Sequence, residues 1–160
     1  MFYSILKGHP LEIEDGEDGS KSVTVELAQN ADGRISALSC NLAPTAVGDE
    51  LFWEFSFSIE VFSLDNSFEP FSTQDRSMAA PYIPSDVRPM AMTIVCKSLS
   101  ALIRHVQPRR VFWVTKEREL PEKALRKYDL LTQTLENAGY SVREVGTDPY
   151  GRRFCSMELA

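Results

Sequence analysis

The chain has 160 residues, of which 43% are hydrophobic and 25% are charged, and its net charge is −6 at neutral pH. This composition predicts one folded domain and excludes global disorder, because enough apolar surface is available to offset the entropy lost on folding. No apolar run approaches the roughly 20 residues that a membrane-spanning helix needs. Since residues 1–7 also lack a secretory signal, we expect a cytoplasmic protein with no membrane partner.

Charge is distributed unevenly between the two halves of the chain. Residues 1–80 carry 14 acidic and 4 basic residues, a balance of −10, whereas residues 81–160 carry 9 acidic and 13 basic residues, a balance of +4. Two interpretations stay open. The halves can attract each other within one fold, or the acidic half can present a face to a basic protein surface.

The first 62 residues predict a β meander. Residues 2–6 are a short candidate strand, and residues 22–28 and 51–62 alternate apolar and polar side chains with the period of two that strands require. Residues 35–42 are the return strand that the turn signal at residues 30–34 predicts. Along residues 51–62, one face carries Trp53, Phe55, Phe57, Ile59 and Val61, and the other carries Glu54, Ser56, Ser58 and Glu60. Residues 43–49, which include Pro44 and Gly48, are expected to break the ladder.

An acidic loop precedes the second predicted strand. It includes Glu12, Glu14, Asp15, Glu17 and Asp18. The loop lacks the ligand spacing of an EF-hand and a glutamate at its twelfth position, which argues against calcium. Its exposed carboxylates are therefore candidates for contact with another protein.

Residues 63–85 predict a long irregular connection, with Phe68, Phe71 and Tyr82 as anchors to the body of the domain. A helix is expected from Asp86, its N-cap, to Val106, ahead of Pro108. Apolar side chains cover most of the circumference of this helix, so we expect it to lie buried across the sheet.

The remaining residues predict a strand, a second helix and a closing β-hairpin. Residues 109–115 read as a buried strand, and the second helix runs from about Pro121 to Gly139. Residues 141–145 and 153–159 form the hairpin. The whole is α+β: a mainly antiparallel mixed sheet with two main helices in one domain, divided into residues 1–62, 63–85 and 86–160.

This order of elements resembles the GCN5-related N-acetyltransferase (GNAT) fold over about residues 50–159. Residues 109–115, 124–128 and 138–140 look like that family's strand, helix and terminal region. The resemblance implies an acyltransferase that uses acetyl-CoA, with the cofactor at the start of the 86–106 helix between two splayed strands, and with Arg76 or Arg88 on its phosphates. It also implies a glycine-rich loop that presents main-chain amides to a pyrophosphate. Here the corresponding residues 74–79 contain no glycine, and close approach of the main chain is then harder.

No complete catalytic or metal signature is present. The three cysteines, Cys40, Cys96 and Cys155, lie in apolar stretches and are interpreted as buried hydrophobic side chains. With only two histidines, His9 and His105, a zinc site is not expected. Tyr128 precedes Gly139 by about three helical turns and fits the apolar stripe of its helix better than an active site.

The leading hypothesis is a non-catalytic interaction protein of accessory, immunity or inhibitor type on a GNAT-like scaffold, with no cofactor. The alternative is an atypical acyl-CoA-dependent N-acyltransferase. Further interaction candidates are the basic residues Arg109, Arg110, Arg118 and Arg126. Nucleic-acid binding through them is a third hypothesis that the overall acidity opposes. A homo-oligomer is left open.

Overall fold

The computed structural model describes residues 11–74, 76–115 and 122–160. The predicted strand at residues 2–6 lies outside this part of the chain. The described residues form one mixed sheet in the order β1-β2-β3-β4-β6-β8-β7, with β5 paired separately to β4. Every neighbouring pair of strands is antiparallel except β4 and β6.

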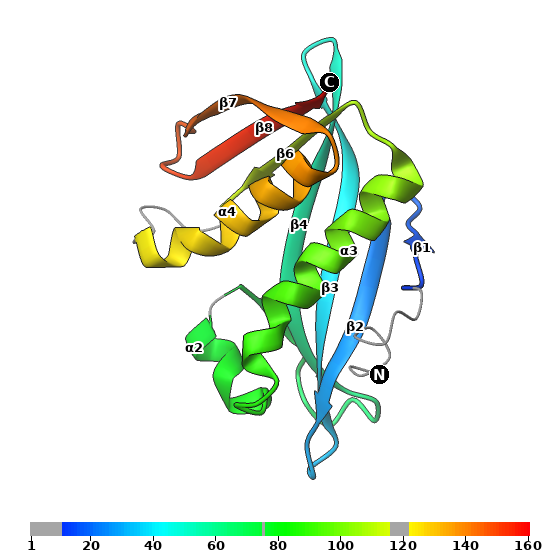
Figure 1. Cartoon of the computed structure of the whole chain (residues 1–160). Helices are drawn as coiled ribbons and strands as arrows, with labels where there is room; N and C mark the ends of the chain where they lie inside the picture. Colours follow the sequence, from blue (N-terminus) through cyan, green and yellow to red (C-terminus); the bar gives the residue numbers. More distant parts are fainter. Residues whose placement is uncertain (1–10, 75, 116–121) are drawn as a thin grey trace.

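The strands differ greatly in length. They are β1 (Glu14–Asp15), β2 (Lys21–Gln29), β3 (Arg34–Val47), β4 (Glu50–Ser63), β5 (Phe71–Thr73), β6 (Arg110–Val114), β7 (Tyr140–Thr147) and β8 (Arg153–Leu159). The two longest, β3 and β4, form a hairpin that runs the full height of the molecule (Figure 1). The predicted meander and the closing hairpin are both confirmed.

Two main helices cover one face of the sheet. They are α3 (Ala91–Val106) and α4 (Glu122–Asn137), and three short helical turns precede α3: α2 (Arg76–Ala79), η1 (Ala80–Tyr82) and η2 (Arg88–Met90). In Figure 1, α3 crosses β2, β3 and β4, and α4 lies beside it, below the hairpin β7–β8 in this view. The predicted fold class, an α+β domain with a mainly antiparallel mixed sheet and two main helices, is therefore confirmed.

The core lies between this face and the helices. Phe55 and Phe57 of β4 belong to it, and Trp53 and Ile59 pack against it, as the alternation in the sequence predicts. The buried face of α3 contributes Ile94, Val95, Leu99, Leu102 and Ile103. None of the helices in the described part of the chain is long and apolar enough to cross a bilayer.

The prediction that residues 43–49 interrupt the ladder is wrong. The pairing of β3 with β4 continues through Pro44↔Trp53 to Val47↔Glu50. On its other side, β3 pairs with β2 only as far as Leu42↔Lys21. Beyond Leu42, β3 is therefore an edge strand on that side, where the missing N–H of proline costs no ladder hydrogen bond.

The structure also differs from the prediction between residues 63 and 91. The expected irregular connection contains β5, α2 and η1, and α3 begins at Ala91 rather than at Asp86. Met90 is the N-cap of α3 and makes no side-chain capping bond. Pro84 and Pro89 explain the delay, because proline donates no N–H and the residue before it disfavours the α conformation.

The end of α4 at Gly139 is confirmed and generates a prediction about stability. Gly139 has φ of +98°, a left-handed conformation that glycine adopts without steric cost. We expect Gly139→Ala to lower the free energy of unfolding by about 1 kcal/mol, and Gly139→Asn to lower it less, because asparagine tolerates this region better. Urea denaturation measures both. Equal losses for the two variants would contradict the conformational explanation.

Candidate functional site

The candidate site is the place where β4 and β6 part. These parallel strands pair at only two positions, Trp53↔Val111 and Glu54↔Phe112. From there β4 continues to Ser63 while β6 turns towards the hairpin β7–β8 (Figure 1). The splayed strands implied by the GNAT resemblance are therefore present. Parting strands leave main-chain groups without a ladder partner, and buried groups of this kind must bond elsewhere.

Three aromatic side chains fill the opening. Tyr128 of α4 stacks on Trp113 of β6 with ring centroids 4.8 Å apart, and its ring lies 6.1 Å from that of Phe57 of β4. Tyr128 is 2% exposed, and the other two are 8% exposed each. Trp113 Nε1 also donates a hydrogen bond of 3.2 Å to Thr132 Oγ1. Tyr128 is thus a core residue, as its place in the helical stripe indicates.

Gln74 closes the opening from the side. Its Nε2 donates a 2.6 Å hydrogen bond to the main-chain oxygen of Phe57, and its Oε1 accepts a 3.2 Å hydrogen bond from the Tyr128 hydroxyl. A primary amide suits this place because it carries a donor on one side and an acceptor on the other. We call these two hydrogen bonds the Gln74 latch.

The next stretch of the β4 edge is covered by β5. Ile59, Glu60 and Val61 of β4 pair with the three residues of β5. The loop around β5 is fixed by the predicted anchors Phe68, Phe71 and Tyr82, whose ring centroids lie 5.5 to 6.1 Å apart. The Arg34 guanidinium lies 4.4 Å above the Phe68 ring. From Phe57 to Val61, the edge of β4 is therefore occupied by the chain itself.

Of the two arginines predicted to contact cofactor phosphates, the structure describes the side chain of Arg88 alone. The Arg88 guanidinium donates to Ile83 O at 2.9 Å and to Ala80 O at 2.6 Å, so it stabilises the turn before α3. Arg76 is the first residue of α2, and its side chain lies outside what the structure describes. No glycine occurs between Gln74 and Ala91. The role of either arginine towards an acyl-CoA stays a prediction.

The predicted acidic residues lie in and next to β1, at one end of the sheet order. Glu12, Glu14, Asp15, Glu17 and Asp18 are all exposed along β1 and the turn that leads into β2. Asp15 Oδ1 lies 2.7 Å from Lys21 Nζ, and Asp18 Oδ1 accepts a hydrogen bond from Ser20 N. The hydrogen bond with Lys21 holds the pKa of Asp15 below its usual value, and hydrogen bonds with the side chain and then the main chain of Ser20 do the same for the pKa of Asp18.

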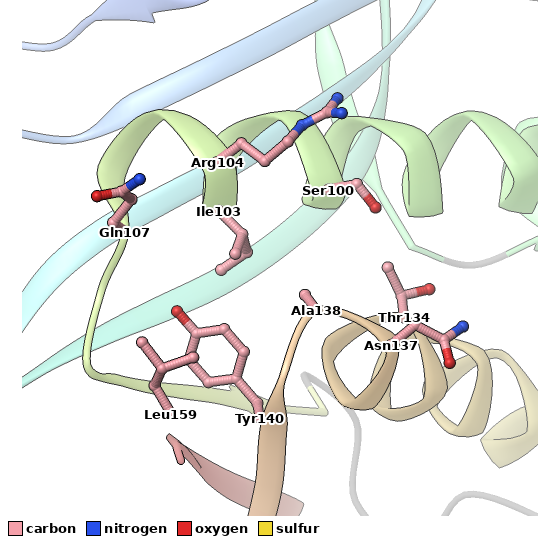
Figure 2. A pocket seen from close by; sticks show the side chains of 9 residues that line it. All are labelled: Ser100, Ile103, Arg104, Gln107, Thr134, Asn137, Ala138, Tyr140 and Leu159. Carbon is pink, nitrogen blue, oxygen red and sulfur yellow. The ribbon is translucent and has the colours of Figure 1, made fainter.

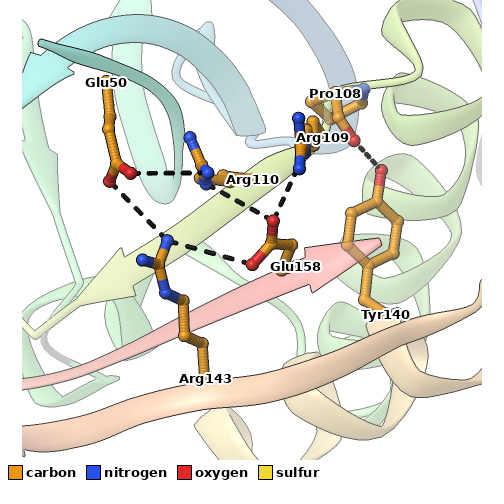
Figure 3. A network of polar contacts seen from close by, with 7 residues as sticks. All are labelled: Glu50, Pro108, Arg109, Arg110, Tyr140, Arg143 and Glu158. Carbon is orange, nitrogen blue, oxygen red and sulfur yellow. Dashed lines mark hydrogen bonds and ion pairs between the residues drawn. The ribbon is translucent and has the colours of Figure 1, made fainter. Parts of the chain in front are cut away.

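The predicted basic residues do not share one environment. Arg109 and Arg110 belong to a network with Glu158, Glu50 and Arg143 that links the β3–β4 hairpin to β6, β7 and β8 (Figure 3). Arg126 is exposed on α4, and Arg118 lies outside the described residues. Sequence reasoning missed Glu50 and Glu158 as partners, because each is remote in sequence from the arginines that it binds.

A pocket of about 660 Å³ lies between the C-terminal halves of α3 and α4 (Figure 2). Ile103, Tyr140 and Leu159 make its apolar part. The Tyr140 hydroxyl is bonded to the main-chain oxygen of Pro108, and Thr134 Oγ1 donates to Leu130 O at 2.7 Å. The lining contains no carboxylate, cysteine or histidine, and its hydroxyl groups are those of Ser100, Thr134 and Tyr140, so it lacks the side chains that most often act as general bases.

Two further observations concern possible catalytic groups. Burial raises the pKa of the Cys40 thiol to about 12, so this thiol stays protonated at neutral pH and is a poor nucleophile. Among the described residues, no three histidine, cysteine, aspartate or glutamate side chains are grouped so that they could hold a metal ion.

The comparisons with known proteins are sparse. No family model matches the chain, and no curated protein matches it. A search of solved structures finds a chimera of spermidine N-acetyltransferase SpeG from Vibrio cholerae and hSSAT, with 9% sequence identity and a TM-score of 0.43. The alignment covers 89% of this chain and 68% of that chain. At this degree of likeness the comparison assigns neither a family nor an activity.

The Gln74 latch generates a second prediction. Tyr128→Phe removes the hydrogen bond to Gln74, and Gln74→Ala also leaves the Phe57 carbonyl without its partner. We expect Tyr128→Phe to lower the free energy of unfolding by about 1 kcal/mol, and Gln74→Ala to lower it by about 1–3 kcal/mol. A double-mutant cycle from urea denaturation should give a coupling of at least about 0.5 kcal/mol.

Tyr150→Phe is the matched control, because Tyr150 is 62% exposed, and it should change stability little. A coupling of zero between Gln74 and Tyr128 would show that the latch does not form.

Proposed function

We propose that this chain acts by binding another protein, as a non-catalytic accessory, immunity or inhibitor-type protein on a GNAT-like scaffold. The Gln74 latch is the observation that carries the proposal. A ligand that entered between β4 and β6 would need to form hydrogen bonds with the main chain of β4 on the side that faces the opening, as an added strand does. That edge is already bonded to Gln74 and β5, and Tyr128 and Trp113 occupy the space beside it.

The start of α3 supports the same proposal. The segment before it contains two 3₁₀ turns and prolines in place of glycines, so side chains surround the main chain where an anion would need to approach. Arg88, which could have neutralised a phosphate, is bonded to two carbonyl groups of the chain. Binding an acyl-CoA here would break those contacts and the latch.

The acidic residues of β1 and its turn supply the proposed docking surface. They are exposed, they lie close together along 12–18, and the half of the chain that contains them has a balance of −10. A surface of this kind attracts a basic protein partner and speeds the encounter with it, in a manner that salt weakens. The proposed partner is therefore a protein with a basic face.

An acyl-CoA-dependent N-acyltransferase is the alternative function. The parting of β4 and β6 favours it, since that parting opens one side of the β4 edge. This alternative requires the latch to release Phe57 and Tyr128 to move away from the opening. It therefore predicts that the chain binds acetyl-CoA.

Calorimetry with acetyl-CoA separates the two functions. We expect no saturable heat from the wild-type chain, because the latch and the aromatic rings occupy the opening. A dissociation constant of about 100 µM or tighter for the wild-type chain would contradict the proposal and favour the acyltransferase. Gln74→Ala tests whether the latch is the cause, because a binding signal in this variant alone would show that the latch excludes the cofactor.

The docking surface is tested by neutralising its five carboxylates in Glu12→Gln, Glu14→Gln, Asp15→Asn, Glu17→Gln and Asp18→Asn together. We expect an affinity-tagged variant to lose, in a pull-down, the basic partner that the wild-type chain retains at low salt. The matched control removes five exposed carboxylates elsewhere, at Asp49, Glu69, Asp86, Asp129 and Glu136. Loss of the partner from both variants, or from neither, would count against the acidic surface.

A further inference from the structure

Strand β7 forms an open edge of the sheet. It is the last strand in the sheet order, and among the described residues it pairs with β8 alone. Five consecutive residues from Ser141 to Val145 are exposed, including Val142 at 46% and Val145 at 66%. A long edge strand with exposed valines is a template for another strand, and proteins ordinarily protect such edges.

A β-bulge divides β7 between the two valines. Val142 pairs with Met157 and Glu144 pairs with Ser156, so Arg143 is the extra residue. Val145 pairs with Cys155, and Cys155 and Met157 both lie in the core on the helix-bearing face. Because of the bulge, Val142 and Val145 lie on that same face, although their separation of three residues would otherwise place them on opposite faces.

The opposite face of β7 carries charge. Arg143 Nη1 reaches Glu50 at 3.6 Å and Glu158 at 3.9 Å, and Figure 3 shows it pointing towards both. Glu144 follows it and is exposed. The sequence of the edge is therefore Val-Arg-Glu-Val, with an apolar residue at each end and opposite charges in the middle.

The hydrogen bonds of β8 show which groups of β7 face outward. Leu159 N donates to Arg109 O, and Arg153 O accepts from Thr115 N. The main-chain N–H and C=O groups of every second residue, counted from Arg153 to Leu159, therefore point towards β6. Phe154, Ser156 and Glu158 therefore face β7, and their partners on β7 are Gly146, Glu144 and Ser141. The main-chain groups of Val142 and Val145 consequently point away from β8.

We propose that a second copy of this chain pairs with the outer edge of β7, antiparallel, about a two-fold axis between Arg143 and Glu144. Val142 then lies opposite Val145 of the partner subunit, and Arg143 lies opposite Glu144 of the partner subunit. Each contact occurs twice, as a two-fold interface requires. The four valines meet on one face, and two opposite-charge pairs meet on the other.

The bulge selects a second copy over another strand. Outward-facing residues of a regular strand are two positions apart, whereas Val142 and Val145 are three positions apart. An ordinary strand therefore loses register at the bulge, and this is how a bulge protects an edge. A second copy carries the same extra residue at the symmetry axis, so both hydrogen-bonding positions stay matched. This proposal is independent of the acidic surface and of the closed opening.

The test uses the full chain in two variants. At about 100 µM, where even a weak interface is populated, sedimentation should give the wild-type chain twice its 18.0 kDa mass. Arg143→Glu places two glutamates opposite each other across the axis, and Glu144→Arg places two arginines there, so each variant alone should be monomeric. An equimolar mixture restores both opposite-charge pairs and should return to the dimer mass.

Glu69→Arg is the control, since it makes the same charge change at an exposed loop residue, and it should remain dimeric. A monomeric wild-type chain at this concentration overturns the proposal, as does a mixture of folded variants that stays monomeric. If Arg143→Glu does not fold, hydrogen exchange of the wild-type chain decides. The amides of Val142 and Val145 should exchange more slowly as concentration rises, and an unchanged rate overturns the proposal.

Discussion

The side chain of Gln74 spans the opening between β4 and β6, because its amide joins a main-chain oxygen of β4 to the hydroxyl of Tyr128 on α4. Strands that part must satisfy the groups they release, and a buried carbonyl without a partner costs about 1–3 kcal/mol. This chain meets the requirement from within. The same sheet geometry could have left the place open for a ligand, but here the Gln74 amide, the rings of Trp113 and Tyr128, and β5 occupy it.

The rest of the molecule is arranged around that closed opening. The aromatic anchors of the 63–85 segment hold β5 against β4, and the arginine–glutamate network holds the β3–β4 hairpin to β6 and β8. Interactions with the environment are then left to the periphery. The acidic turn beside β2 and the open edge of β7 lie at the two ends of the sheet order, so the proposed partner surface and the proposed self-association surface would not overlap.

The sequence predicts the local elements better than the contacts between them. Period-two alternation along residues 51–62 places Phe55 and Phe57 in the core correctly, and Gly139 marks the end of α4. Pro44 leads to a wrong prediction, because a proline interrupts a ladder only where its N–H would have formed a hydrogen bond. The pairing with β2 ends before Pro44, and the sequence does not show where that pairing ends. The GNAT resemblance places Gln74 in the segment that corresponds to a phosphate-binding loop. The partners of Gln74 are 17 and 54 residues away, and no local pattern encodes such a contact.

The most direct measurement is a titration of the ¹⁵N-labelled chain with acetyl-CoA, followed through the side-chain resonances of Gln74 and Trp113. The Trp113 indole N–H is bonded to Thr132 beside the opening, so both groups report on its occupation. The closed scaffold predicts that neither resonance moves up to millimolar cofactor. Saturable shifts of both resonances at micromolar cofactor would contradict the account.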